Sequence, residues 1–151
     1  MRLVDALFRR FRRIRREDPV FGSMLYMGDR LKYWEGKAKF GPTNSVIEIF
    51  VDGSAQDSLG EQRKFFEHVV QEWVGLSEVI GRILLESSRK YEPILQDDSP
   101  WDHFKASSLS IPQGPFEDAE WEFSFATPGK TNRLWTVRMK GRQARQVVVD
   151  D

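Results

Sequence analysis

The feature that most constrains this fold is a change in the spacing of apolar residues along the chain. Residues 34–40 and 121–125 alternate apolar with charged or polar side chains, whereas the apolar residues of 65–84 recur at every third or fourth position. Alternation is typical of a strand with one buried side, and the longer period is typical of an amphipathic helix. Strands grouped before and after helices indicate an α+β fold rather than an alternating parallel sheet.

The same periodicities predict the order of the elements. We expect a meander of three strands, then two helices, then a meander of four strands, all in one antiparallel sheet with the helices on one face. The predicted strands cover 24–26, 31–40 and 46–51, and later 109–111, 121–125, 134–139 and 147–149, with a polar linker over 96–103.

Two helices are predicted, over 59–73 and 78–91. Ser58 and Glu61 have the spacing of a capping box, and Ser77 is placed to cap the second helix. The large side chains on the predicted inner faces are expected to be largely buried. These are Trp34, Phe65, Val69, Trp73, Ile80, Trp121, Phe123, Phe125 and Trp135.

The first seventeen residues carry a different pattern. Residues 1–16 contain seven arginines and one aspartate of the chain's 23 basic and 23 acidic residues, which leaves sixteen basic and 22 acidic residues in the remainder. Apolar residues between Leu3 and Ile14 recur at helical spacing, and Pro19 ends the pattern. We therefore expect a basic amphipathic helix over 1–17, followed by a single α+β domain over 18–151.

A basic amphipathic helix has three uses that the sequence leaves open. It can bind an anionic membrane surface, it can lie in a groove of a protein partner, or it can pack on its own domain. Nucleic acid is the weakest partner, because the acidic remainder of the chain would repel phosphate. The candidate interaction residues in this segment are Arg9, Arg10, Arg12, Arg13 and Arg16.

An acidic run precedes and enters the strand predicted at 121–125. Glu120 and Glu122 share one face of that strand, opposite the aromatic face. A solvated strand face explains the carboxylates, but the same residues would also attract a basic protein partner, and two carboxylates can perform acid–base chemistry on a sugar. We take Glu117, Asp118, Glu120 and Glu122 as candidate interaction residues.

Few residues support catalysis or metal binding. The chain has no cysteine and two histidines, and it has no nucleotide-binding, zinc-protease or serine-hydrolase motif. His68 falls in the first predicted helix without an obvious catalytic partner. Asp97, Asp98, Asp102 and His103 could bind a divalent ion, but such Asp- and Pro-rich clusters are usually turns. We therefore expect no cofactor and no metal.

Two short motifs carry a resemblance. Asp18-Pro19-Val20-Phe21-Gly22 and Tyr33-Trp34-Glu35-Gly36 resemble the opening of a group of uncharacterised bacterial domains of unknown function. The resemblance covers residues 18–150 and implies a strand, a helical stretch and a strand meander, with no established catalytic residues. Some bacterial domains of this size and shape look like immunity or partner-neutralising proteins.

Taken together, these patterns favour a non-catalytic protein-interaction module, immunity-like or regulatory, in the cytoplasm. One alternative is a peripheral membrane protein held at the inner membrane face by the arginine-rich helix. Another is a hydrolase that uses Asp or Glu together with His103. No stretch of about 18 apolar residues is present for a membrane-spanning helix.

Overall fold

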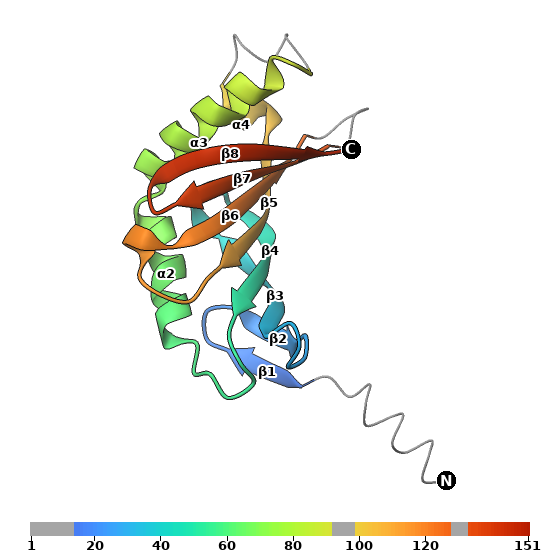
Figure 1. The fold of residues 1–151 in the computed structure, drawn as a ribbon, viewed down its shortest axis with the longest axis vertical. Helices are drawn as coiled ribbons and strands as arrows, with labels where there is room; N and C mark the ends of the chain where they lie inside the picture. Colours follow the sequence, from blue (N-terminus) through green and yellow to red (C-terminus); the bar gives the residue numbers. More distant parts are fainter. Residues whose placement is uncertain (1–13, 92–98, 128–132) are drawn as a thin grey trace, which may run out of the picture.

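The structure is a computed structural model that describes residues 14–91, 99–127 and 133–151. In this part of the chain, eight strands form one sheet in the order β1-β2-β3-β4-β5-β6-β7-β8, and the helices lie on one side of it (Figure 1). The strands are β1 Arg15–Asp18, β2 Gly22–Tyr26, β3 Tyr33–Phe40, β4 Ser45–Asp52, β5 Lys105–Ile111, β6 Glu120–Ala126, β7 Leu134–Lys140 and β8 Gln143–Asp150. The helices are α2 Gly60–Gln71, α3 Trp73–Ser88 and α4 Pro100–His103, and 3-10 turns cover Gly41–Thr43 and Phe116–Asp118.

The α+β class is confirmed, but the sheet is not wholly antiparallel as predicted. β4 and β5 pair in parallel, with Glu48 opposite Ser108 and Val51 opposite Ile111, and all other neighbouring strands are antiparallel. The chain between β4 and β5 holds α2, α3 and α4, and it returns to the end of the sheet where β4 started. A crossover of this length is what a parallel pair requires.

The end of the predicted N-terminal helix is wrong. Residues 15–17 lie in β1, which pairs with β2 through Arg15 opposite Leu25 and Asp18 opposite Gly22. The first meander therefore has four strands rather than three. Residues 15–17, which were predicted to end the N-terminal helix, belong to the sheet. The rest of the predicted helix, over 1–13, lies outside the described residues.

The two long helices are present with different ends. The helical conformation is interrupted at Glu72, so α2 ends at Gln71 and α3 begins at Trp73. Ser77 therefore lies inside α3 and does not cap it, and its hydroxyl donates to the carbonyl oxygen of Val74. The predicted capping box is also wrong, because the residue before α2 is Leu59, in a left-handed conformation, without a side-chain cap. The predicted linker over 96–103 ends in the short helix α4, which packs against α3 at Gly81.

The core lies between the sheet and the helices and is rich in aromatic rings. Phe40 contacts the rings of Phe66, Trp73 and Phe123 at centroid distances of 5.0–6.3 Å, and so joins β3 to both helices and to β6. The predicted burial is confirmed for every residue named except Trp73, which is only partly buried. Within the described residues, no helix is long and apolar enough to cross a membrane.

Candidate functional site

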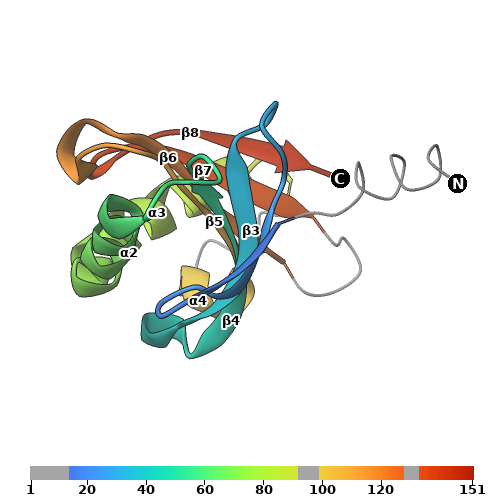
Figure 2. The same cartoon turned by 90° about the horizontal axis from the view of Figure 1, so that it is seen from below.

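The face of the sheet away from α2 and α3 is the candidate interaction surface, which we call the open face. Figure 2 shows the described helices gathered on the other side of the sheet. The strand registers place Phe50, Ser110, Glu122, Arg138 and Gln146 in one row across β4 to β8. The side chains of this row therefore project together from the open face.

A groove of about 760 Å³ lies at one end of the open face. It runs over the end of β4 and β5 and the adjoining parts of β6, β7 and β8, and we call it the open-face groove. Its lining residues are Asp52, Ser110, Ile111, Pro112, Glu120, Trp121, Glu122, Arg138, Met139, Lys140, Arg145 and Gln146.

Charge is divided across the open-face groove. The acidic side chains come from β4 and β6, and the basic ones come from β7 and β8. At the boundary, Arg138 Nε donates to Glu122 Oε1 at 3.2 Å, and Arg138 Nη1 donates to Gln146 Oε1 at 3.3 Å. The Glu122 and Arg138 side chains are about half exposed, so their ion pair contributes at most about 1 kcal/mol to stability. The charges thus remain able to interact with another molecule.

Asp52 lines this groove, and partial burial raises the pKa of its carboxyl group above the ordinary aspartate value. The folded chain then binds more protons than the unfolded chain above about pH 4, so this group lowers the free energy of unfolding as pH rises through its folded pKa. We expect Asp52→Asn to stabilise the chain more at pH 7 than at pH 4. The measurement is the difference in urea midpoint between the variant and the natural chain at each pH. Glu48→Gln, at another exposed carboxylate of the same strand, is the matched control. A midpoint difference that does not change with pH would contradict the prediction.

The four predicted acidic residues separate into two places. Glu120 and Glu122 line the open-face groove, as expected from strand alternation. Glu117 and Asp118 lie in the 3-10 turn before β6, where Glu117 Oε1 is 3.5 Å from Arg142 Nη2. The run therefore does not form one acidic patch.

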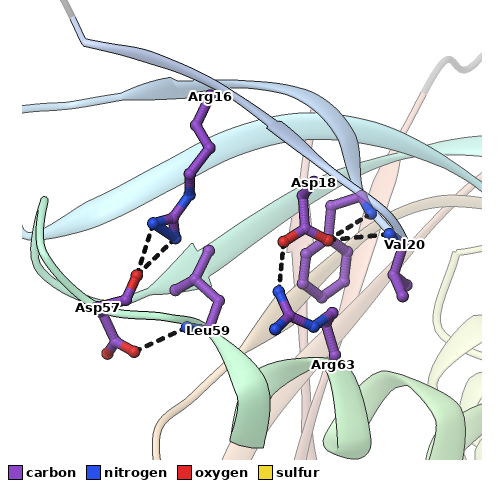
Figure 3. Close-up of polar contacts among 7 residues, drawn as sticks. Arg16, Asp18, Val20, Asp57, Leu59 and Arg63 are labelled. Atoms are coloured by element: carbon purple, nitrogen blue, oxygen red, sulfur yellow. Dashed lines mark hydrogen bonds and ion pairs between the residues drawn. The ribbon is translucent and has the colours of Figure 1, made fainter.

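Arg16 does not lie on a helix but holds a loop in place. Both of its terminal nitrogens donate to the carbonyl oxygen of Asp57 at 2.6 Å (Figure 3). Its guanidinium also lies 4.6 Å from the Trp34 ring centroid. Asp57 Oδ1 in turn accepts from the backbone N–H of Leu59 at 2.9 Å. These bonds fix the left-handed Leu59, a conformation that costs a β- or γ-branched side chain free energy. Arg16 therefore makes structural contacts within the chain, and its role as an interaction residue stays a prediction.

Asp18 and Arg16 both link β1 to residues later in the chain. We call these two residues and their partners Asp57 and Arg63 the β1 clamp. Its Oδ1 accepts from the backbone N–H groups of Val20 and Phe21 at 2.9 and 3.1 Å, and its Oδ2 accepts from Arg63 Nη1 at 2.6 Å. Figure 3 shows these bonds joining β1 to α2. Since the Asp18 side chain is 2% exposed and its oxygens are bonded within the chain, it offers nothing to a ligand.

The two histidines lie in different places, and neither lines the open-face groove. His68 lies on α2, with its ring centroid 4.2 Å from that of Phe116. His103 ends α4, whose Trp101 packs on the inner face against Phe125, whereas Glu120 and Glu122 project from the open face. The sheet therefore separates His103 from this carboxylate pair.

Within the described ranges, no three His, Asp or Glu side chains form a group that could hold an ion. Asp97 and Asp98 lie outside those ranges. Arg9, Arg10, Arg12 and Arg13 also lie outside them, so the use of the arginine-rich segment stays a prediction.

With this geometry in hand, the chain was compared with known proteins. No family model, no curated protein and no solved structure matches it. The resemblance to uncharacterised bacterial domains therefore stays a prediction, and the surface itself must support any functional argument.

Sequence reasoning missed the basic side of the open-face groove. Arg138 and Lys140 alternate with the buried Val137 and Met139, so a sequence signal for their outward direction was present. The sequence pattern did not predict the register of β6 with β7, which sets Arg138 opposite Glu122 and Lys140 opposite Glu120.

Proposed function

We propose that this chain is a non-catalytic protein-interaction module that binds a protein partner through the open-face groove. The observation that carries the proposal is the groove of about 760 Å³, with carboxylates along one side and basic side chains along the other. Cytoplasmic location, and an immunity-like or regulatory role, are parts of the same proposal.

The charge division favours a protein over other ligands. A polyanion such as nucleic acid would meet Asp52, Glu120 and Glu122 as well as the basic side chains, and phosphate would be repelled by them. A protein surface can present a basic strip to the acidic side and an acidic strip to the basic side, and such complementarity sets orientation and excludes wrong partners. The exposed edges of Phe50 and Ser110 in the same row add an apolar and a small polar contact.

The experiment that tests the proposal is affinity capture from the native host, using the natural chain and variants with reversed charges. Glu122→Arg and Arg138→Glu each disrupt the charge division, and we expect each to weaken retention of the partner by about tenfold or more. The control is Glu78→Arg, an exposed site on α3 away from the groove, which is expected to retain the partner. The double variant Glu122→Arg with Arg138→Glu keeps the cross-strand ion pair, so it separates loss of binding from loss of folding.

Two results decide the matter. A partner that is lost with the groove variants, including the double variant, but kept with Glu78→Arg supports the proposal. A partner that all variants retain equally contradicts the assignment to this groove. In that case a truncation that begins at Ile14 is the next variant, because it removes Arg9 to Arg13 and leaves β1 intact.

A further inference from the structure

The two edges of the sheet differ in a way that bears on association. β1, at one edge, has four residues, all of them charged. β8, at the other edge, has eight residues, and the run Val147–Val149 in its second half is uncharged and free of proline. The outer N–H and C=O groups of an edge strand invite pairing with another strand, and short or charged edges resist it. The β8 edge has a bulge at Arg145 and ends in Asp150, but its Val147–Val149 run carries neither a charge nor a bulge.

The valines of β8 are also incompletely covered. Val147, Val148 and Val149 are each partly buried, while Trp135 and Val137 opposite them in β7 are fully buried. Among the described residues no strand lies beyond β8, which borders the sheet in Figure 2. A strand added along this edge would cover the remaining apolar surface and pair the outer backbone groups.

We propose that two copies of this chain associate through β8, which pairs with β8 of the second copy in antiparallel orientation. The register that we infer is centred on Val148. It sets Val147 opposite Val149 of the second copy, and it sets Arg145 opposite Asp151 of the second copy, twice by symmetry. A two-fold axis through Val148, perpendicular to the sheet, relates the copies, as is usual for closed dimers.

Charge complementarity favours this register and this occupant. Arg145 is the extra residue of a bulge, because the partners of β8 in β7 shift between Gln146 and Ala144. Centring on Val147 instead would set Arg145 opposite Val149 and Ala144 opposite Asp150, which leaves both charges without a counterpart. The Val148 register instead gives Arg145 a counter-charge in Asp151, which also accepts from Arg133 Nε at 2.6 Å within its own chain, and it sets Asp150 opposite Gln146, whose amide can donate to the carboxylate. It requires no sequence outside this chain.

The association goes beyond the proposed function, and the two share Arg145, which lines the open-face groove and lies opposite Asp151 in the register above. Val148 is not among the residues that line the open-face groove. Variants at Val148 therefore test the dimer, whereas variants at Glu122 and Arg138 test the groove.

The chain contains no cysteine, so single-cysteine variants report on one pair of positions. In an antiparallel pair, directly opposed residues have Cα atoms about 4.5–5.5 Å apart, within the range of about 4.4–6.8 Å that a disulfide spans. Val148→Cys is expected to form a disulfide-linked dimer as the main product of mild oxidation. Val46→Cys, at a valine that is 68% exposed on β4, is the matched control and is expected to remain mostly unlinked.

Sedimentation equilibrium of the natural chain gives the second readout. We expect a monomer–dimer equilibrium whose dissociation constant rises about tenfold or more in Val148→Lys, because the axis brings two like charges together. Val46→Lys should leave it unchanged, and circular dichroism checks that each variant folds. A natural chain that stays monomeric at all concentrations, or Val148→Cys that cross-links no faster than Val46→Cys, overturns the proposal.

Discussion

Replacing Trp121 with alanine is expected to lower the free energy of unfolding by about 3–5 kcal/mol, the range for a large aromatic ring removed from a core. The Trp121 residue is 3% exposed, and its ring lies 5.7 Å from that of Phe65 and 5.8 Å from that of Phe116. Its Nε1 donates to the buried carbonyl oxygen of Gly141 at 2.8 Å. Alanine would leave both a cavity and an unpaired carbonyl, so the cost has two parts.

Urea unfolding followed by circular dichroism measures this effect. One further variant separates the two parts of the cost, and a second serves as a control. Trp121→Phe keeps an aromatic ring but loses the hydrogen bond to Gly141, and it should cost less, about 1–3 kcal/mol. Glu120→Ala, at the exposed neighbouring position of β6, should change the free energy of unfolding by no more than about 0.5 kcal/mol. A loss below about 1 kcal/mol in Trp121→Ala would mean that the aromatic side of β6 is not part of the core.

The backbone around Trp121 explains why the acceptor lies where it does. Gly141 has a φ of +52°, in the left-handed region, and its N–H donates to the carbonyl oxygen of Ala119 at 2.9 Å. A Cβ at this position would collide with the carbonyl oxygen of Glu117. Glycine thus allows the β7–β8 turn to approach the start of β6 closely enough for the indole bond.

Strand alternation predicted the parts of the fold that depend on local pattern. In β3 and β6 the apolar residues that the sequence indicated are buried, and the glutamates and lysines between them are exposed or partly exposed, because neighbouring side chains of a strand point to opposite faces. Ser124 departs from the alternation, since it is buried as well. The inner and outer faces of these strands, including the outward direction of Glu120 and Glu122, could therefore be read from the sequence.

β1 could not be predicted in the same way. Arg15–Asp18 contains no apolar residue, and it continues the arginine spacing of the preceding segment, which favoured a helix. Its strand conformation depends on pairing with β2 and on the contacts of Arg16 with Trp34 and Asp57, which are 18 and 41 residues away. Such tertiary contacts override local propensity.

The open-face groove was missed for a related reason. It needs the parallel pairing of β4 with β5, which follows a crossover through three helices, and it needs the register of β6 with β7. The spacing of apolar residues along the chain predicts neither the pairing of these strands nor their register. The sequence could place acidic residues on an outer face, but it could not place Arg138 beside Glu122 or Asp52 at the same end of the sheet.

Replacing Asp18 with alanine is expected to lower the free energy of unfolding by about 3 kcal/mol, because it breaks a buried ion pair. The residue lies in β1, a four-residue edge strand that the sequence did not predict. The change removes the acceptor of two backbone N–H groups and leaves Arg63 without its carboxylate. Hydrogen bonds to charged groups are stronger than neutral ones, and the loss of one partner leaves the others unsatisfied. Thermal or urea unfolding of the variant beside Glu17→Ala, an exposed neighbour in β1, measures the difference.

A double-mutant cycle with Arg63 then divides this cost between the ion pair and the turn. Asp18→Asn retains an oxygen for the N–H groups of Val20 and Phe21 but loses the charge, so it should recover part of the stability that alanine loses. If the 2.6 Å bond to Arg63 contributes, Asp18→Ala and Arg63→Ala together should cost less than the sum of the single changes, by about 1–2 kcal/mol. Additive costs would show instead that Asp18 acts through the turn alone, and that β1 is joined to α2 by Arg16 and packing rather than by this ion pair.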